Sequence, residues 1–237
     1  MMLLEEMTWP EIESGLKRSK TIILPVGATE EHGPHLPIIT DTAQAVEAAK
    51  EAARRRDIFV APEISYGVCR STKGFPGTIT ITRESLYALA HDVLLSLHDS
   101  GFRNVMILTG HAGGQHLSAL DEACQRAVAE RDFRVSMVSL FDLIDMSKVE
   151  AKGDGHAGEI ETSMMMKIRG DLVKGTPGPN FPPRPRFLVM KDVRHFMGNG
   201  IMGDPSRASL EKGKMFFEMA VQGVLEALDE LESYPEH

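Results

Sequence analysis

The sequence predicts an α/β fold in which a single domain forms an α/β/α sandwich around a mainly parallel sheet. Short, almost continuously apolar runs alternate along the chain with longer segments whose apolar residues have helical spacing. Apolar strands of this kind are typical of a parallel sheet that is buried on both faces, and their alternation with helices indicates repeated βα units. A length of 237 residues is enough to bury the core of one such domain.

The first part of the chain provides two helices and two strands. A short helix begins after Thr8, because this residue can cap it, Pro10 suits its first turn and Glu11 completes a capping box. The elements that follow are an apolar strand, an alanine-rich helix and a second, short strand, at residues 21–26, about 42–55 and 58–61.

The remaining chain continues the alternation of helices and strands. Thr82 caps a helix whose apolar residues recur at helical spacing, and Gly101 ends it. The later elements are a buried strand, a helix, another strand and a long final helix, at residues 104–108, 115–130, 135–139 and about 205–231. The proline-rich segment 175–186 precedes the final helix. We interpret it as a long surface loop within one domain, residues 1–237, rather than as a linker.

The composition excludes several classes of protein. A net charge of −8 argues against a nucleic-acid-binding protein, which would carry a basic surface. No apolar run approaches the roughly 20 residues that cross a bilayer, and the N-terminal segment carries acidic residues where a signal peptide carries basic ones. Cys69 and Cys124 are too few for a disulfide framework, and nothing marks Cys69 as a nucleophile, although it could line a pocket. We therefore expect a soluble, cytoplasmic protein.

The most informative stretch of the chain, residues 24–41, includes the end of the first long strand and the loop after it. It places Glu30, His32 and Asp41 within twelve positions of a loop rich in glycine and proline. A plain surface turn would not need such an irregular backbone. Asp41 also stands at the expected N-cap of the alanine-rich helix, so it either caps that helix or bridges two cations. His35 is a weaker candidate, for a pocket residue.

Two later loops carry the same chemistry. His111 follows a predicted buried strand and lies between glycines, which suits either a metal ligand or an anion-binding nest at the start of a helix. In the third cluster, His156 precedes Glu159 and Glu161, which fall in the first turn of a helix if that helix begins near Gly158. There the two carboxylates either bind metal or complement the helix dipole.

The three clusters together predict one metal site. Ligands of parallel α/β sheets lie outside the carboxyl ends of the strands, and two of the clusters follow strands there. Mixed nitrogen and oxygen ligands suit zinc, manganese or iron(II), whereas oxygen ligands alone would suit magnesium or calcium. Each cluster taken alone is equally compatible with an ordinary loop, but three of them in one chain favour a metal centre.

These residues resemble the creatininase (creatinine amidohydrolase) family. The resemblance covers the chain from about Ile22 to the last helix and depends on four motifs. They are the run from Val26 to Asp41, the segment Phe75-Pro-Gly-Thr-Ile-Thr, the loop Gly-His-Ala-Gly-Gly around His111 and the segment His156-Ala-Gly-Glu-Ile-Glu-Thr-Ser. The resemblance implies a creatininase-like α/β/α domain, two divalent metal ions per chain (zinc, iron(II) or manganese) and hydrolysis of a non-peptide C–N amide bond. It also implies a homo-oligomer, often a hexamer.

The resemblance also implies two sets of metal ligands by position: Glu30, Asp41 and His111 for one ion, and His32 with the bridging Asp41 for the other. Creatininase itself has a glutamate where this chain has Gly113, so the second ion would lack one ligand. We expect Glu159 to replace that glutamate, with Glu161 as the next candidate.

The implied mechanism uses hydroxide held between the two ions, because coordination lowers the pKa of water toward about 7. His156 is the expected general acid for the leaving nitrogen, and Glu161 is expected to orient His156 or a ligand. Creatininase clamps its substrate with tryptophans, whereas this chain has only Trp9, in the N-terminal helix. Creatinine is therefore a poor candidate for the substrate.

Basic residues near the predicted pocket indicate a phosphorylated small molecule. Arg70 and Lys73 suit a phosphate, with a solvated loop as the alternative, and His35 and Gly113 are further expected pocket residues. A second basic group surrounds the proline-rich loop and consists of Arg184, Arg186, Lys191 and Arg194. We favour the family members that deformylate a formylaminopyrimidine ribosyl phosphate in riboflavin and deazaflavin biosynthesis. The alternatives are hydrolysis of creatinine or another cyclic amide, trimming of a peptide cofactor precursor, and metal binding without catalysis.

Overall fold

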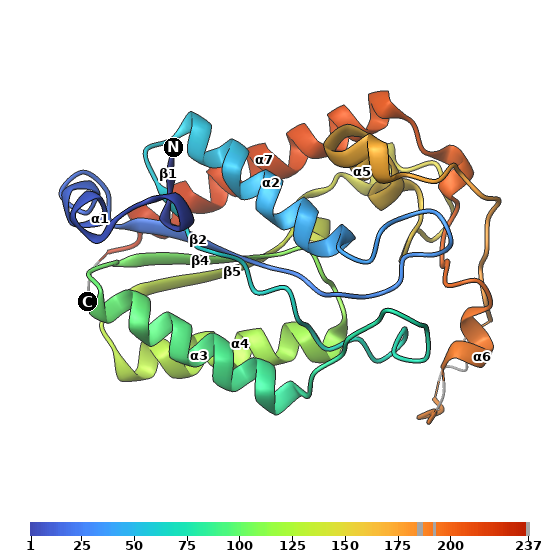
Figure 1. The fold of residues 1–237 in the computed structure, drawn as a ribbon, viewed down its shortest axis with the longest axis horizontal. Helices are drawn as coiled ribbons and strands as arrows, with labels where there is room; N and C mark the ends of the chain where they lie inside the picture. Colours follow the sequence, from blue (N-terminus) through green and yellow to red (C-terminus); the bar gives the residue numbers. More distant parts are fainter. Residues whose placement is uncertain (184–186, 192, 236–237) are drawn as a thin grey trace.

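A parallel sheet of five strands forms the centre of the part of the chain that the structure describes (Figure 1). The structure is a computed structural model, and it describes residues 1–183, 187–191 and 193–235. The strands are β1 (Met2–Leu3), β2 (Thr21–Val26), β3 (Phe59–Val60), β4 (Asn104–Thr109) and β5 (Arg134–Ser139). They lie in the order β1-β3-β2-β4-β5, and each neighbouring pair is parallel.

The two central strands are apolar at almost every position because both faces of the sheet are covered. β2 and β4 pair along their whole length, and every residue of β2 is buried. Side chains alternate between the two faces of a sheet, so Ile23 and Met106 pack in one core while Ile22 and Val105 pack in the other. The strands predicted at residues 21–26 and 104–108 therefore lie at the centre of the sheet.

Helices cover both faces of the sheet. One layer contains α2 (Thr40–Arg55), α5 (Glu159–Arg169) and α7 (Leu210–Ser233), and the other contains α3 (Arg83–Asp99) and α4 (Gly114–Glu130). Figure 1 shows α2 and α7 on one side of the strands and α3 and α4 on the other. The apolar residues of each layer pack against its own face of the sheet. The predicted α/β/α sandwich with a mainly parallel sheet is confirmed.

Shorter elements complete the fold. α1 (Trp9–Gly15) begins at the predicted capping box, in which Glu11 Oε2 accepts the Thr8 N–H at 2.7 Å. α6 covers Arg194–Met197. Short 3-10 turns lie at Leu4–Glu6, Leu140–Leu143, Met146–Lys148, Gly170–Leu172 and Pro205–Arg207.

Several boundaries differ from the sequence prediction. α2 begins at Thr40, so Asp41 lies in its first turn rather than at its N-cap. α7 begins after the expected position because the Ser209 hydroxyl accepts the Lys212 N–H and caps the helix there. The sequence did not predict β1, because two residues are too few for a periodic pattern. β3 is also shorter than the expected strand.

The proline-rich segment behaves as the predicted loop over its described part. Residues 175–183 contain no helix or multi-residue strand, and Asn180 forms an isolated bridge with Gly203. Arg184 and Arg186, which we assigned to a basic group, lie outside the described residues. No helix among the described residues is long and apolar enough to cross a membrane.

Candidate metal centre

Residues from all three polar clusters meet at the carboxyl ends of β2 and β4. They line a cavity of about 390 Å³. Glu30 comes from the loop after β2, Asp41 from the first turn of α2, and His111 from the loop after β4. His156 comes from the loop before α5, and Glu161 from the first turn of α5. The topology thus brings together chain segments that are far apart in the sequence.

Two groups of potential ligands share one carboxylate. In the first group, His111 Nδ1 lies 2.8 Å from Glu30 Oε1 and 2.9 Å from Asp41 Oδ2. In the second group, His32 Nε2 lies 3.0 Å from Asp41 Oδ1 and 3.3 Å from Glu161 Oε1. The Asp41 carboxylate presents one oxygen to each group, as a bridging ligand does.

The donor atoms fit two divalent cations. Asp41 Oδ2 has no hydrogen-bond partner among the described residues, although His111 Nδ1 is only 2.9 Å away. The nitrogen–oxygen separations of 2.8–3.3 Å between each histidine and its carboxylates agree with bonds of about 2.0–2.2 Å to a shared ion such as zinc. The three carboxylates are each at most 4% exposed, and buried charges of this kind require a compensating partner. Cations between the donors would provide that compensation.

Main-chain carbonyl groups orient the two histidine rings. His32 Nδ1 donates to the Glu30 carbonyl oxygen at 3.2 Å, which leaves His32 Nε2 with its lone pair toward Asp41. His111 Nε2 donates to the Val68 carbonyl oxygen at 3.3 Å, which leaves His111 Nδ1 toward the first group. Such contacts set the tautomer and direction of a metal-binding imidazole.

Similar contacts fix the carboxylates. The Thr72 hydroxyl donates to Glu30 Oε2, so that Glu30 Oε1 points at His111. The Ala157 N–H donates to Glu161 Oε2, so that the other oxygen faces the second group. Ala157 has a φ of 51°, a left-handed conformation that costs a non-glycine residue on the order of 1 kcal/mol. The strained residue is thus the one whose N–H group holds the Glu161 carboxylate.

The electrostatics of the two groups favour positive charge between the carboxylates. Burial lowers the pKa of His32, but Asp41 and Glu161 outweigh it and raise that pKa well above its ordinary value. Burial lowers the pKa of His111 as well, and Glu30 and Asp41 raise it. Protons and cations therefore compete for these donors, so metal binding weakens as the pH falls.

The structure does not bring Glu159 to either group, which corrects the assignment that we made from the sequence. Lys212 Nζ lies 2.7 Å from Glu159 Oε1, while Oε2 accepts the N–H groups of Glu150 and Ala151 at 2.9 and 2.7 Å. Both oxygens are thus held between the first turn of α7 and the segment before α5. Glu161 takes the place in the second group, because residues two apart on a helix point to different sides.

His156 lies in the wall of the cavity, as expected of a general acid. Its Nε2 donates to the Glu31 carbonyl oxygen at 2.9 Å, and its ring centre lies 4.4 Å from that of His32. Burial and His32 lower the pKa of His156, whereas the Glu31 side chain and nearby carboxylates raise it, and the net shift is upward. The ring is therefore held in place and retains a proton more readily than free histidine.

The expected substrate-binding residues are placed differently from one another. Gly113 and Arg70 line the cavity. Lys73 lines a neighbouring cavity of about 580 Å³, which Arg70 also borders. His35 Nε2 lies 2.8 Å from Thr162 Oγ1, and burial lowers the pKa of His35 to about 4. His35 is not among the described residues that line either cavity, so its expected place in the pocket stays a prediction.

Thr109 and His116 hold the His111 loop, a role that the sequence pattern did not assign to them. His116 Nε2 lies 3.1 Å from Thr109 Oγ1, which accepts the His111 N–H and donates to the His111 carbonyl oxygen. Gly110 lets this loop approach α2, because a Cβ there would lie 2.1 Å from the Asp41 carbonyl oxygen. A side chain at Gly113 would meet the His111 ring, with a Cβ 2.5 Å from its Nε2. In the sequence, the glycines on either side of His111 are the feature that indicates this close packing.

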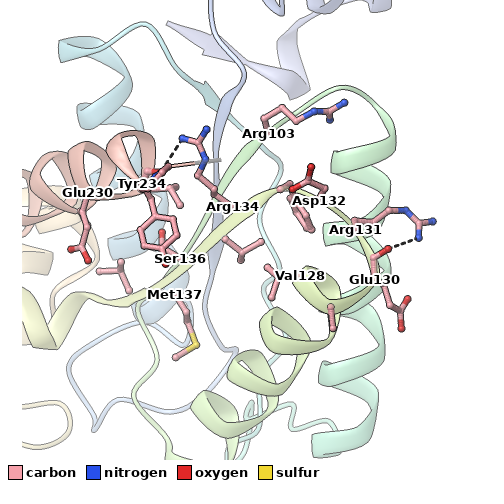
Figure 2. A pocket seen from close by; sticks show the side chains of 17 residues that line it. Arg103, Val128, Glu130, Arg131, Asp132, Arg134, Ser136, Met137, Glu230 and Tyr234 are labelled. Atoms are coloured by element: carbon pink, nitrogen blue, oxygen red, sulfur yellow. Dashed lines mark hydrogen bonds between the residues drawn. The ribbon is translucent and has the colours of Figure 1, made fainter. Parts of the chain in front are cut away.

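A larger cavity lies away from these groups. It measures about 990 Å³ and lies beside β5, between the C-terminal parts of α4 and α7 (Figure 2). Figure 2 shows Arg103, Arg131 and Glu130 around it, together with Tyr234 and Met137. Its described lining residues include no histidine or cysteine. The smaller cavity at the carboxyl ends of the strands is therefore the candidate site.

Known proteins resemble this chain along nearly its whole length. The family model "Creatininase: Creatinine amidohydrolase" matches residues 5–228. The chain is 29% identical to the creatinine amidohydrolase of Pseudomonas putida, with 95% of each chain covered. It is 32% identical to the mycofactocin precursor peptide peptidase of Mycolicibacterium smegmatis, with 85% of this chain and 81% of that protein covered.

Solved structures show the same likeness. A crystal structure of creatinine amidohydrolase has a TM-score of 0.89 and 25% identity, with 98% of this chain and 99% of that chain covered. A manganese creatininase has a TM-score of 0.87 and 25% identity, with 99% of each chain covered. A mutant creatininase of zinc–zinc type has a TM-score of 0.88 and 26% identity, with 98% of each chain covered.

Proposed function

The chain belongs to the creatininase family of metal-dependent amidohydrolases, and from this premise we propose that it removes the formyl group of a formylaminopyrimidine ribosyl phosphate. The observation that carries the proposal is the pair of buried ligand groups sharing Asp41, at the wall of a small cavity that Arg70 also lines. Such a cavity accommodates a formamide and places a cationic side chain beside it.

Two divalent ions are the cofactor that the ligand groups suit. Glu30, Asp41 and His111 would hold one ion, and His32, Asp41 and Glu161 the other. When bound, the ions would polarise the amide carbonyl and lower the pKa of a water molecule between them. Carboxylates and imidazoles accept zinc, manganese or iron(II), so the donor set leaves the choice among these metals open.

His156 is the proposed proton donor to the leaving nitrogen. It lines the same cavity as Glu30 and Asp41, and its pKa is shifted upward, which keeps it protonated nearer to neutral pH. The hydrogen bond from its Nε2 to the Glu31 carbonyl oxygen restricts rotation of the ring. A fixed imidazole can transfer its proton without first reorienting.

The phosphate of the proposed substrate has a cationic environment near the ligand groups. Arg70 borders both the cavity of about 390 Å³ at the ligand groups, here called the ligand cavity, and the neighbouring cavity of about 580 Å³. Lys73 and Arg83 line the neighbouring cavity. The N-terminus of α4 borders the ligand cavity, and its first turn has no acidic residue. Partial positive charge at a helix N-terminus and arginine side chains both favour phosphate. An extended ligand could thus place its amide at Asp41 and its phosphate beside Arg70.

The relatives define the alternative substrates. The Pseudomonas putida protein is a creatinine amidohydrolase, and the Mycolicibacterium smegmatis protein is a mycofactocin precursor peptide peptidase. Trp9, the only tryptophan of this chain, is 75% exposed in α1, at the end of the sheet opposite to α5 (Figure 1). Trp9 therefore lies away from the ligand groups of its own chain. A cavity of about 390 Å³ also suits a formyl group better than an extended peptide.

Formate release from the phosphorylated substrate and from its dephosphorylated analogue tests the proposal, with creatinine and a short peptide as further substrates. We expect formate from the phosphorylated compound in the presence of divalent metal. Arg70→Ala should raise KM for that compound about tenfold, because losing a hydrogen bond to a charged group costs roughly 1.5 kcal/mol. Arg126→Ala, on the exposed surface of α4, is the matched control.

Other outcomes separate the parts of the proposal. Formate release that is independent of the phosphate would remove the role given to Arg70. Opening of creatinine or cleavage of the peptide without formate would replace the substrate and leave the amidohydrolase in place. Two bound ions without activity on any of these substrates would favour a non-catalytic member of the family.

A further inference from the structure

The thiol of Cys69 lies beside the first ligand group and has no role in the proposed function. Cys69 is 1% exposed and lines the cavity together with Glu30 and His111. Its Sγ, a Glu30 oxygen and a His111 ring nitrogen all lie within 4.8 Å of one another. A buried thiol usually packs as a small apolar group, whereas this one is placed among charged donors.

The position of Cys69 is tied to that of His111. The peptide unit between Val68 and Cys69 is anchored at both of its ends. Its carbonyl oxygen accepts the hydrogen bond from His111 Nε2 at 3.3 Å, and its N–H donates to Thr80 Oγ1 at 2.9 Å. The same peptide thus orients the imidazole and holds the thiol next to it, so neither can move without disturbing the other.

The other cysteine shows what ordinary burial looks like in this protein. Cys124 lies on α4 and packs in the apolar core with Leu120 and Ala123. It takes part in none of the groups of potential ligands among the described residues. Cys69 and Cys124 are both free thiols, so they form a natural pair for comparison.

We infer that Cys69 Sγ is an additional ligand of the cation held by Glu30, Asp41 and His111. The inference rests on the proposed dinuclear centre. On binding, the thiol proton leaves to solvent and a sulfur–metal bond forms, which adds one negative charge to a group whose Asp41 Oδ2 is buried without a hydrogen-bond partner. Thiolate is a soft ligand, so Cys69 makes this position favour zinc over manganese.

Cobalt(II) reports a sulfur ligand directly, because a thiolate bound to cobalt gives a charge-transfer absorption band in the near ultraviolet. The experiment loads the metal-free protein with two equivalents of cobalt and records its spectrum and bound metal. We expect the band in the wild-type protein and in Cys124→Ser, and its loss in Cys69→Ser with cobalt still bound. In competition between zinc and manganese, Cys69→Ser should lower the preference for zinc at least about tenfold.

The possible failures can be told apart. Wild-type protein that binds two cobalt ions without the band would overturn the inference and leave the dinuclear centre standing. A band that persists in Cys69→Ser, or that disappears equally in Cys124→Ser, would also overturn it. Protein that binds no cobalt would instead contradict the metal centre and the proposed function. Circular dichroism of each variant verifies that the fold is retained.

Discussion

At the scale of single residues, Asp41 determines how the two ligand groups are related. Its Oδ2 lies 2.9 Å from His111 Nδ1 and its Oδ1 lies 3.0 Å from His32 Nε2. The residue is 1% exposed and lies in the first turn of α2, so the helix fixes its direction. A substitution there should affect both cations at once.

We expect Asp41→Asn to lose both ions, because an amide supplies one neutral oxygen where the carboxylate supplies two charged ones. Elemental analysis of the purified variant gives the metal content per chain. Asp121→Asn, an exposed position on α4, is the control and should keep the wild-type content. An unchanged pair of ions in Asp41→Asn would contradict the bridging role.

The two glutamates at the start of α5 should behave in opposite ways. Glu161→Gln should fold normally and lose one ion, since Glu161 Oε1 faces His32. Glu159→Gln should keep both ions and lower the free energy of unfolding by about 1–3 kcal/mol, because Lys212 loses its buried partner. Metal analysis and urea unfolding measure the two effects. Selective metal loss in Glu159→Gln would restore our original assignment.

His116 should make the protein less stable in acid. Burial lowers its pKa in the folded protein to about 3, whereas the unfolded ring titrates near 6.5. Between these values the unfolded state binds more protons, so the free energy of unfolding falls as the pH is lowered, by up to about 1.4 kcal/mol per pH unit.

His116→Gln removes this titration and can still donate to Thr109 Oγ1. We expect the metal-free variant to show a flatter dependence of unfolding free energy on pH between about 3 and 6.5 than the metal-free wild type. Chemical unfolding at a series of pH values provides the comparison. Parallel curves for the two proteins would show that His116 does not titrate in this range.

For single residues, the sequence identifies which residue types form the site better than it identifies the directions in which their side chains point. The polar clusters, together with the resemblance to creatininase, led us to expect Glu30, His32, Asp41 and His111 in one site, and the four residues do lie together. The choice between the two glutamates could not be made, because it depends on how α5 begins. That start is set by the left-handed Ala157 and by Asp154, and neither residue belongs to a periodic pattern.

At the scale of elements, the start of α5 is the feature that places Glu161. Asp154 accepts hydrogen bonds from the N–H groups of Glu159 and Ile160 at 2.7 and 2.8 Å, and so caps the helix from outside it.

The strands also differ in how well the sequence predicts them. β2 and β4 are visible because continuous apolar residues fill both faces of the sheet, whereas β1 and β3 owe their pairing to neighbours distant in the sequence.

We expect Asp154→Ala to lower the free energy of unfolding by about 1–2 kcal/mol, because two N–H groups at the start of α5 lose their acceptor. Loss of this acceptor should also shift the start of α5 and with it Glu161. The variant should therefore bind the ion at Glu161 more weakly. Denaturant unfolding measures the first effect and metal titration the second. Asp145→Ala, which removes an exposed cap of a 3-10 turn, should cost less. Equal losses in both variants would contradict the special role of Asp154.

At the scale of the whole molecule, the α/β/α sandwich leaves the carboxyl ends of its central strands as the place where distant loops meet. The order β3-β2-β4 puts the loops after β2 and β4 side by side, which is why two separate motifs form one centre. One domain over residues 1–237 and a homo-oligomer of this chain remain predictions. A single unfolding transition and a light-scattering mass above 26.1 kDa would support them.

Anomalous X-ray scattering from crystals grown with zinc or manganese tests the dinuclear centre most directly. We predict two peaks roughly 3.5–4 Å apart, one on each side of the Asp41 carboxylate. One peak should lie beside His111, and the other between His32 and Glu161. A solitary peak, or a second peak beside Glu159, would contradict the account.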